Sequence, residues 1–251
     1  MPNASSGFKR IAHRGASGEA PENTLPAIRL AFEKYRVDRV EMDLRPSKDG
    51  VPMVIHDAAL ERTTNGQGLV SHHTAEELKK LDAGKGAGVP TLAEVLKEFP
   101  DSGFFLEIKE EDPEFVDKVL AVVRHIGGKG PLTIGSFHGP VMHRLRNLKA
   151  PSIHSIFSRE EVFWTYLKFR LGFHKFHPPS HHASLPRQEY GFRLDDPDWI
   201  RFLHRHEIRV YYWTIDDPKE MAALIERGVD GIMTNYPGRL NEVLQSLRGA
   251  P

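Results

Sequence analysis

The stretch Arg39-Val40-Glu41-Met42-Asp43-Leu44-Arg45 decides how the whole chain is interpreted. Its apolar and charged residues alternate, and in a β-strand a period of two places the two sets on opposite faces. The apolar face must pack under helices, so the charged face points inward. Glu41 and Asp43 therefore project side by side, about 6–7 Å apart at the backbone. Buried charges are rarely left unpaired, so we expect an ion or a salt-bridge network to join them.

Short apolar strands alternate with helical patterns along the rest of the chain. Strands are predicted at residues 9–13, 37–44, 52–56, 104–109, 132–135, 152–155, 182–185, 208–213 and 230–234. Helices are predicted at residues 24–35, 92–99, 114–126, 140–148, 159–171, 198–204, 219–227 and 238–247. Repeated βα units predict parallel strands, and roughly eight such units are typical of a closed (β/α)8 TIM-type barrel. An open doubly wound sheet is the alternative, but the first strand is not followed by a Gly-x-Gly-x-x-Gly turn.

The amino-acid composition and net charge of the chain exclude several functional classes. Lys and Arg number 34, equal to the 34 Asp and Glu, so a net charge of zero provides no whole-molecule attraction to nucleic acid or to an anionic membrane. The absence of cysteine excludes disulfides and thiolate chemistry. We see no signal peptide, and no apolar run approaches the roughly 20 residues of a membrane span. We therefore expect a cytoplasmic protein with a single domain, residues 1–251.

Two segments depart from the regular alternation of strands and helices. Residues 58–90 are polar, rich in glycine and too long for an ordinary loop, which predicts a small insertion over the barrel mouth. Residues 163–176 are aromatic and basic. The favoured interpretation is a buried amphipathic helix whose Lys168 and Arg170 reach water. The alternative is an apolar flap that admits an acyl chain or makes transient contact with lipid.

The charged residues at the strand ends suggest phosphoester chemistry. Glu41, Asp43 and Glu107 form an all-oxygen set that suits one hard divalent cation, Mg²⁺ or Ca²⁺, better than Zn²⁺. Arg14 and Lys109 supply positive charge and hydrogen-bond donors for phosphate oxygens.

Two histidines complete the set. His13 and His56 can titrate near neutrality, one to take a proton and the other to give it. A lone histidine at a strand end is more often only hydrogen-bonded, and a Glu-x-Asp pair can be a structural ion-pair cluster with Arg39 or Arg45. The combination favours function, because these residues fall where strands of one barrel end. Cation, phosphate donors and paired histidines together describe hydrolysis of a phosphodiester.

A series of short motifs closely resembles the glycerophosphodiester phosphodiesterase family. These motifs are His-Arg-Gly at 13–15, Pro-Glu-Asn-Thr at 21–24, Glu-x-Asp at 41–43, His-Asp at 56–57, Glu-Ile-Lys at 107–109, Trp-Thr at 213–214 and Val-Asp-Gly-Ile-Met-Thr-Asn-Tyr-Pro at 229–237. The resemblance covers nearly the whole chain, and it implies a TIM-type barrel with a small insertion after the second strand. It also implies a divalent metal on the three carboxylates and acid/base roles for the two histidines.

The resemblance extends to substrate contacts and to the reaction. It implies that Arg14 and Lys109 hold the phosphate, that Asn23 orients the first loop and that Trp213 contributes to substrate binding. The family's reaction has two steps. A free glycerol hydroxyl attacks the phosphorus and expels the alcohol, and water then opens the cyclic phosphate to glycerol 3-phosphate.

Three other functions remain open at this point. A lysophospholipase D would use the same site with a different alcohol pocket, and some relatives of that type carry apolar segments in the region of residues 163–176. An enzyme resembling phosphatidylinositol phospholipase C is less compatible, because bacterial forms replace the metal by an arginine whereas three carboxylates are present here. A non-catalytic module that binds phosphodiesters is disfavoured by the intact set of site residues.

Two further features of the sequence stand apart from these motifs. Asn235 occupies a position where many relatives have aspartate. His174, His177, His181 and His182 could form a second metal site, but prolines intervene and no carboxylate is adjacent, so a solvated loop is favoured.

Overall fold

The computed structural model describes residues 7–148, 150, 152–173, 175–189 and 191–249. Eight parallel strands form a nearly closed barrel: β1 (Lys9–His13), β2 (Arg39–Pro46), β4 (Phe104–Ile108), β5 (Leu132–Gly135), β6 (Ile153–Ser155), β7 (His182–Leu185), β10 (Arg209–Tyr212) and β11 (Gly231–Thr234). Their spatial order is β6-β5-β4-β2-β1-β11-β10-β7. The two ends of this order are linked where the Phe157 backbone N–H donates to the His182 carbonyl at 3.2 Å. The predicted TIM-type barrel is confirmed.

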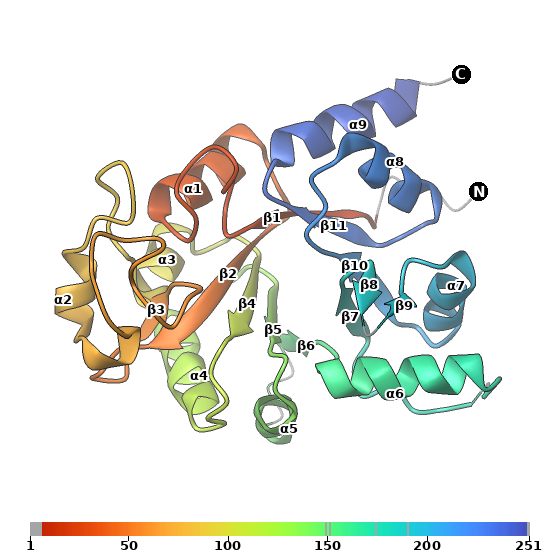
Figure 1. Ribbon diagram of the computed structural model, residues 1–251, viewed down its shortest axis with the longest axis horizontal. Helices are drawn as coiled ribbons and strands as arrows, with labels where there is room; N and C mark the ends of the chain where they lie inside the picture. Colours follow the sequence, from red (N-terminus) through yellow and green to blue (C-terminus); the bar gives the residue numbers. More distant parts are fainter. Residues whose placement is uncertain (1–6, 149, 151, 174, 190, 250–251) are drawn as a thin grey trace.

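Helices cover the outside of the barrel (Figure 1). They are α1 (Leu25–Arg29) with the π-helical turn η1 (Leu30–Lys34), α3 (Leu92–Glu98), α4 (Phe115–Ile126), α5 (Gly139–Asn147), α6 (Arg159–Arg170), α7 (Pro197–Arg205), α8 (Pro218–Glu226) and α9 (Pro237–Gly249). Local sequence explains several starts. Thr91 and Glu94 form a capping box at α3, and Asp217 caps α8 ahead of Pro218. Each helix predicted from the sequence is present close to its expected bounds.

The two faces of β2 are used as the alternation predicts. Val40, Met42 and Leu44 are fully buried in the core cluster beneath the helices. Burial of such side chains stabilises the fold by about 1.5–3 kcal/mol each. Glu41 and Asp43, on the opposite face, are only 1% exposed because they point into the barrel. Packing on the outer face therefore fixes the position of the charges on the inner face.

One strand predicted among the parallel βα units lies outside the barrel. β3 (Pro52–Val54) pairs antiparallel with the far end of β2, with Val54 opposite Leu44. The connection between the two strands contains no helix, and a short connection permits a hairpin but not a parallel crossover. The prediction of a parallel unit for residues 52–56 was therefore wrong.

The chain then forms the small insertion that the sequence predicts. It contains η2 (Val70–His72) and α2 (Ala75–Lys79), and it has a core of its own that includes Leu60 and Leu78. Arg62 of this segment pairs with Glu22 in the first βα loop at 2.8 Å. The insertion, orange in Figure 1, thus contacts the end of the barrel at which the strands terminate.

The aromatic and basic stretch forms α6, whose buried residues are Val162, Thr165 and Tyr166. This helix follows β6 and runs back toward the start of β7, so its last turn lies at the end of the barrel where strands begin (Figure 1). A short hairpin of β8 (Gln188–Glu189) and β9 (Phe192–Arg193) was not predicted. In the part of the chain that the structure describes, no helix has the length and apolarity needed to cross a bilayer.

Candidate active site

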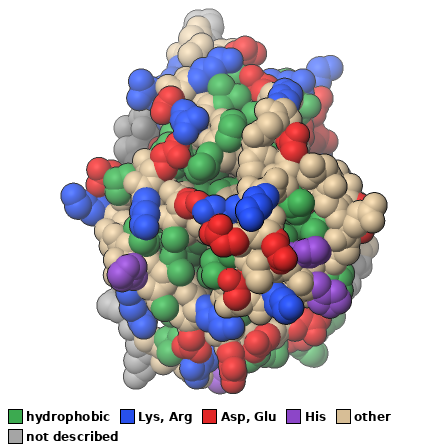
Figure 2. Space-filling view, turned by 90° about the vertical axis from the view of Figure 1, so that its left-hand side faces the viewer, with side chains coloured by type: hydrophobic (Ala, Val, Ile, Leu, Met, Phe, Trp, Pro, Cys, Tyr) green, Lys and Arg blue, Asp and Glu red, His purple; other side chains and the backbone are tan. Residues whose placement is uncertain are grey.

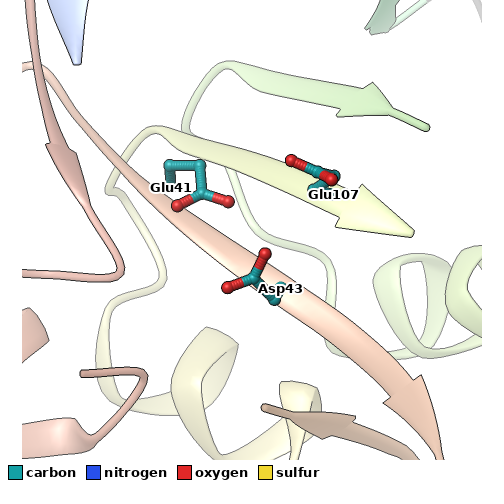
Figure 3. Close-up of side chains that lie close together, drawn as sticks. All are labelled: Glu41, Asp43 and Glu107. Atoms are coloured by element: carbon teal, nitrogen blue, oxygen red, sulfur yellow. The ribbon is translucent and has the colours of Figure 1, made fainter. Parts of the chain in front are cut away.

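Three carboxylates meet at the carboxyl ends of two adjacent strands. Glu41 and Asp43 come from β2, and Glu107 comes from β4, where it lies directly opposite Asp43 in the parallel register. One oxygen of each lies within 4.8 Å of the others. Figure 3 shows the three side chains pointing toward one another from the neighbouring strands. The carboxylate cluster predicted from the sequence is therefore assembled by strand register alone.

The cluster has the properties of a site for a hard cation. Glu41 Oε1 and Asp43 Oδ1 are buried and have no hydrogen-bond partner among the described residues. Burial, followed by the charges of Asp43 and Glu107, raises the pKa of Glu41 well above its ordinary value of 4.5. Unsatisfied, mutually repelling carboxylate oxygens are costly unless a cation is bound. These residues therefore fit a divalent metal ion.

Two basic side chains reach the same carboxylates. Lys109 forms ion pairs with Glu107 and with Asp43, whose Oδ1 lies 3.0 Å from Lys109 Nζ without the geometry of a hydrogen bond. Arg14 Nε lies 3.0 Å from Asp43 Oδ2. Burial alone would raise the pKa of Asp43, but Lys109 and Arg14 outweigh burial and lower it. Figure 2 shows acidic and basic side chains gathered near the centre of the face that includes this end of the barrel.

His13, at the end of β1, is held in one tautomer. Its Nδ1 lies 2.7 Å from Asn235 Oδ1, and Asn235 Nδ2 donates to Asp216 Oδ2 at 2.6 Å. A carboxylate can only accept, so the Asn235 amide nitrogen faces Asp216 and its oxygen faces His13. His13 therefore carries its proton on Nδ1. Its Nε2, 3.9 Å from Glu41 Oε2, is left as the basic nitrogen toward the carboxylates.

His56 follows β3 and is oriented by a carboxylate instead. Its Nδ1 is hydrogen-bonded to Asp57 Oδ1, and Asp57 is held in turn by Arg62. The hydrogen bond from Arg62 is the largest of the influences that lower the pKa of Asp57, so Asp57 remains ionised. Arg45 Nε donates to the His56 carbonyl at 2.6 Å and fixes the backbone. Burial lowers the pKa of His56, so a neutral imidazole with a free Nε2 is available near neutrality.

The first βα loop is shaped by backbone conformations that its sequence permits. Arg14 and Asn23 have φ values of 56° and 57°, and Gly15 has a φ of 81°. A Cβ on Gly15 would lie 2.6 Å from the Ala27 backbone, so only glycine fits there. Asn23 Nδ2 donates to Asp43 Oδ2 at 2.8 Å, and its Oδ1 accepts from the Asp43 N–H at 3.3 Å. Asn23 thus ties the loop to the carboxylate cluster.

Comparison with known proteins now supplies a family. The family model described as "Glycerophosphoryl diester phosphodiesterase family" matches residues 13–239. The chain belongs to this family. A glycerophosphodiester phosphodiesterase of Caldanaerobacter subterraneus is 31% identical over 92% of this chain and 95% of its own length. A lysophospholipase D of Mus musculus is 27% identical over 94% of this chain and 82% of its own length.

Solved structures agree with the family assignment. A phosphodiesterase of Oleispira antarctica, solved in complex with the product sn-glycerol-3-phosphate, has a TM-score of 0.79 and 28% identity. The match covers 96% of this chain and 98% of that protein. The resemblance inferred from the motifs is thereby confirmed.

Trp213 lies just beyond β10. The family resemblance implies that this residue contributes to substrate binding. Its ring centre is 5.7 Å from that of Phe137, and Lys109 Nζ lies 5.6 Å from the centre of the Phe137 ring. An aromatic wall therefore stands beside Lys109. Phe137, 39% exposed, was not singled out from the sequence as a site residue.

Asp216 was also missed. Asp217, the next residue, caps α8 ahead of Pro218, and Asp216 takes no part in that cap. Asp216 instead accepts hydrogen bonds from Thr234 and Asn235, and it thereby orients the partner of His13. An isolated acidic residue before a cap carries no sequence signal for this function.

The histidine-rich loop does not assemble into a second metal centre in the described part of the chain. The three-carboxylate cluster is the group of potential ligands found there, and His177, His181 and His182 belong to no such group. His174 lies outside the described residues. His182 instead points into the opposite end of the barrel, where its Nδ1 lies 3.2 Å from the Tyr211 hydroxyl.

Proposed function

We propose that this chain hydrolyses glycerophosphodiesters to glycerol 3-phosphate and an alcohol, with one bound divalent cation. The observation that carries the proposal is the cluster of three carboxylates flanked by two histidines, each held through Nδ1 by a different partner. The names of the relatives support the substrate class, as does the product seen in the Oleispira antarctica structure.

The charges of the site match a metal ion and a phosphodiester together. Three carboxylates and two cations leave these five groups with one net negative charge when the histidines are neutral. A bound Mg²⁺ or Ca²⁺ on Glu41, Asp43 and Glu107 would reverse that sign and would polarise a phosphoryl oxygen. A substrate with a single negative charge would then be attracted to a site that otherwise repels it.

The chain's own residues would position the substrate and move protons. Arg14 and Lys109 would donate hydrogen bonds to the phosphate oxygens. One histidine Nε2 would take the proton from the attacking glycerol hydroxyl as the P–O bond forms. The other, which must enter the step as the imidazolium, would protonate the departing alcohol oxygen as its bond to phosphorus breaks and would leave the step neutral. Water would next attack the cyclic phosphate with the same two histidines in exchanged roles, which gives glycerol 3-phosphate.

The substrate's alcohol is the open part of the proposal. Lysophospholipase D activity is the alternative, because relatives with that name match the chain. Leu171 and Phe173 are more than half exposed, but they follow α6 at the far end of the barrel, so they favour contact with a lipid surface over a flap at the active site. Comparison of turnover of lysophosphatidylcholine with that of glycerophosphocholine separates the two activities.

His56→Ala provides the test of the site. We expect normal folding by circular dichroism and loss of glycerol 3-phosphate release from glycerophosphocholine. His204→Ala is a matched control, because His204 Nε2 also pairs with a carboxylate, Asp230, at 2.9 Å but lies on the outer helix α7. Retention of turnover in His56→Ala, or an equal loss in His204→Ala, would remove His56 from the mechanism.

A further inference from the structure

The end of the barrel opposite the active site contains a group of basic side chains that the proposed function does not use. Arg39 begins β2, His154 lies on β6, His182 begins β7 and Arg209 begins β10. We refer to these four residues as the basic cluster. Strand alternation places Arg39 on the inward face of β2 that also carries Glu41. The basic cluster therefore surrounds the mouth at which the strands begin.

Arg39 is the buried centre of the basic cluster. The residue is 5% exposed, and one terminal nitrogen donates a hydrogen bond to Thr133 Oγ1. Its Nε is buried and has no hydrogen-bond partner in the described chain. A buried guanidinium nitrogen without a partner is costly, because its desolvation is not compensated. The unpartnered Nε of Arg39 thus indicates a position where a bound group could accept a hydrogen bond.

No carboxylate of the described residues forms an ion pair with Arg39 or Arg209. Two acids close to the cluster, Asp38 beside Arg39 in the chain and Asp230 opposite the Val210 N–H, form their ion pairs with other residues. Asp38 pairs with Arg10 at 3.0 Å, and Asp230 pairs with His204 at 2.9 Å. The basic cluster is therefore a local excess of positive charge in a protein whose net charge is zero.

The two histidines are packed against this charge. Their ring centres are 4.6 Å apart, and His182 Nδ1 lies 3.2 Å from the Tyr211 hydroxyl. Burial, followed by the charges of His154 and Arg39, lowers the pKa of His182 to about 3. His182 is therefore neutral at pH 7, and it can donate or accept a hydrogen bond without adding to the repulsion.

The basic cluster opens to solvent on one side and is separated from the carboxylates on the other. His154 and Arg209 are exposed, whereas Arg39 and His182 are buried behind them. Ile11, Phe105 and Met233 are at most 4% exposed and fill the barrel between the two ends. A small solute could therefore reach the basic cluster without passing through the active site.

We propose that the basic cluster binds a small oxyanion of the phosphate or sulfate class at the mouth where the barrel strands begin. Arg39 Nε and the Arg209 guanidinium are the charged donors, and His154 and His182 are the neutral donors. The Tyr211 hydroxyl, already beside His182 and Arg209, is a further donor. The anion cancels the excess positive charge, so its binding stabilises the folded barrel.

Sulfate at constant ionic strength is the probe, with thermal unfolding and the imidazole NMR signals of His154 and His182 as readouts. We expect a saturable rise in Tm and saturable shifts of both signals for the wild type and for Arg124→Gln, a control on the exposed face of α4. Arg209→Gln should weaken the apparent affinity for sulfate about ten- to hundredfold, because it removes a charged donor. It should also have the higher Tm without sulfate, because it relieves like-charge repulsion.

Two more variants address sulfate binding at the active site and the case in which Arg209→Gln does not fold. Lys109→Met removes a phosphate donor at the opposite mouth and should leave the shifts of the His154 and His182 signals unchanged. His154→Ala removes a neutral donor and should weaken sulfate binding, as measured by the rise in Tm, if Arg209→Gln does not fold. The proposal is overturned if Arg209→Gln or His154→Ala keeps the wild-type sulfate response, or if Lys109→Met abolishes the histidine shifts.

Discussion

Replacement of Glu41 by glutamine should make the metal-free protein more stable and inactive at the same time. Carboxylate oxygens of Glu41, Asp43 and Glu107 lie within 4.8 Å of one another. Two unit charges at that separation repel by about 3–4 kcal/mol at an effective dielectric constant near 20. Lys109 and Arg14 offset much of this repulsion, so we expect a net gain of about 2 kcal/mol and a rise in Tm of roughly 4–8 °C for a chain of this size.

The hydrogen bonds of the site predict that the variant keeps its shape. Glu41 Oε2 accepts from the Arg14 N–H at 3.0 Å, and a glutamine oxygen can accept the same bond. Glu41 Oε1 has no hydrogen-bond partner in the described part of the chain, so the glutamine NH₂ group would replace a repelled oxygen with a donor to the neighbouring carboxylates.

The pH dependence of this effect has a defined sign. The pKa of Glu41 is raised in the folded protein above its ordinary value of 4.5, so ionisation of Glu41 destabilises the wild type as pH rises above 4.5. Glutamine does not ionise. The stability difference between Glu41→Gln and the wild type should therefore be small below pH 4.5 and should grow above it.

Thermal unfolding in EDTA from pH 4 to pH 8 measures the difference, and glycerophosphodiester turnover with added Mg²⁺ measures function. Glu98→Gln is the control, because Glu98 forms an exposed pair with Arg29. A Glu41→Gln protein that is less stable than the wild type in EDTA, or that retains metal-dependent turnover, would refute the electrostatic account of the cluster.

Three further predictions concern separate parts of the molecule. Asn235→Ala should lower kcat about 100-fold or more, because His13 loses the partner that fixes its tautomer; steady-state kinetics checks this. Asp195→Asn should cost about 3 kcal/mol at pH 7, because Asp195 is 1% exposed and pairs with three arginines. Burial would raise the pKa of Asp195, but hydrogen bonds from those arginines lower it to about 2, so urea unfolding should show the difference shrinking as pH falls from 4 toward 2. Met42→Ala should cost about 2–5 kcal/mol in the same assay, because the side chain is fully buried in the core.

The alternation in β2 shows why much of the barrel could be predicted from sequence. A period of two with Val40, Met42 and Leu44 on one face allows a single packing direction, so the inward position of Glu41 and Asp43 follows from packing. Glu107 could be assigned to the same inward-facing set of carboxylates, because apolar and charged residues also alternate at the end of β4. The register that places Glu107 opposite Asp43 depends on the whole barrel, and local patterns do not contain it.

The features that escaped prediction depend on contacts between distant residues. β3 has the composition of a barrel strand, and only its short connection to β2 indicates a hairpin. Asp216 reaches the site through Asn235, 19 residues further along the chain. The orphan Nε of Arg39 can be recognised only when the barrel brings Thr133, His154 and Arg209 around it. Sequence patterns report local periodicity, whereas these features follow from closure of the barrel.

Metal-dependent turnover tests the central claim most directly. The chain is stripped with EDTA and assayed for release of glycerol 3-phosphate from glycerophosphocholine, before and after stepwise addition of Mg²⁺ or Ca²⁺. The three-carboxylate site predicts no turnover in the stripped protein, restoration that saturates at one bound cation per chain, and no restoration in Asp43→Asn. Undiminished turnover in the stripped protein, or full restoration in Asp43→Asn, would contradict the proposed mechanism.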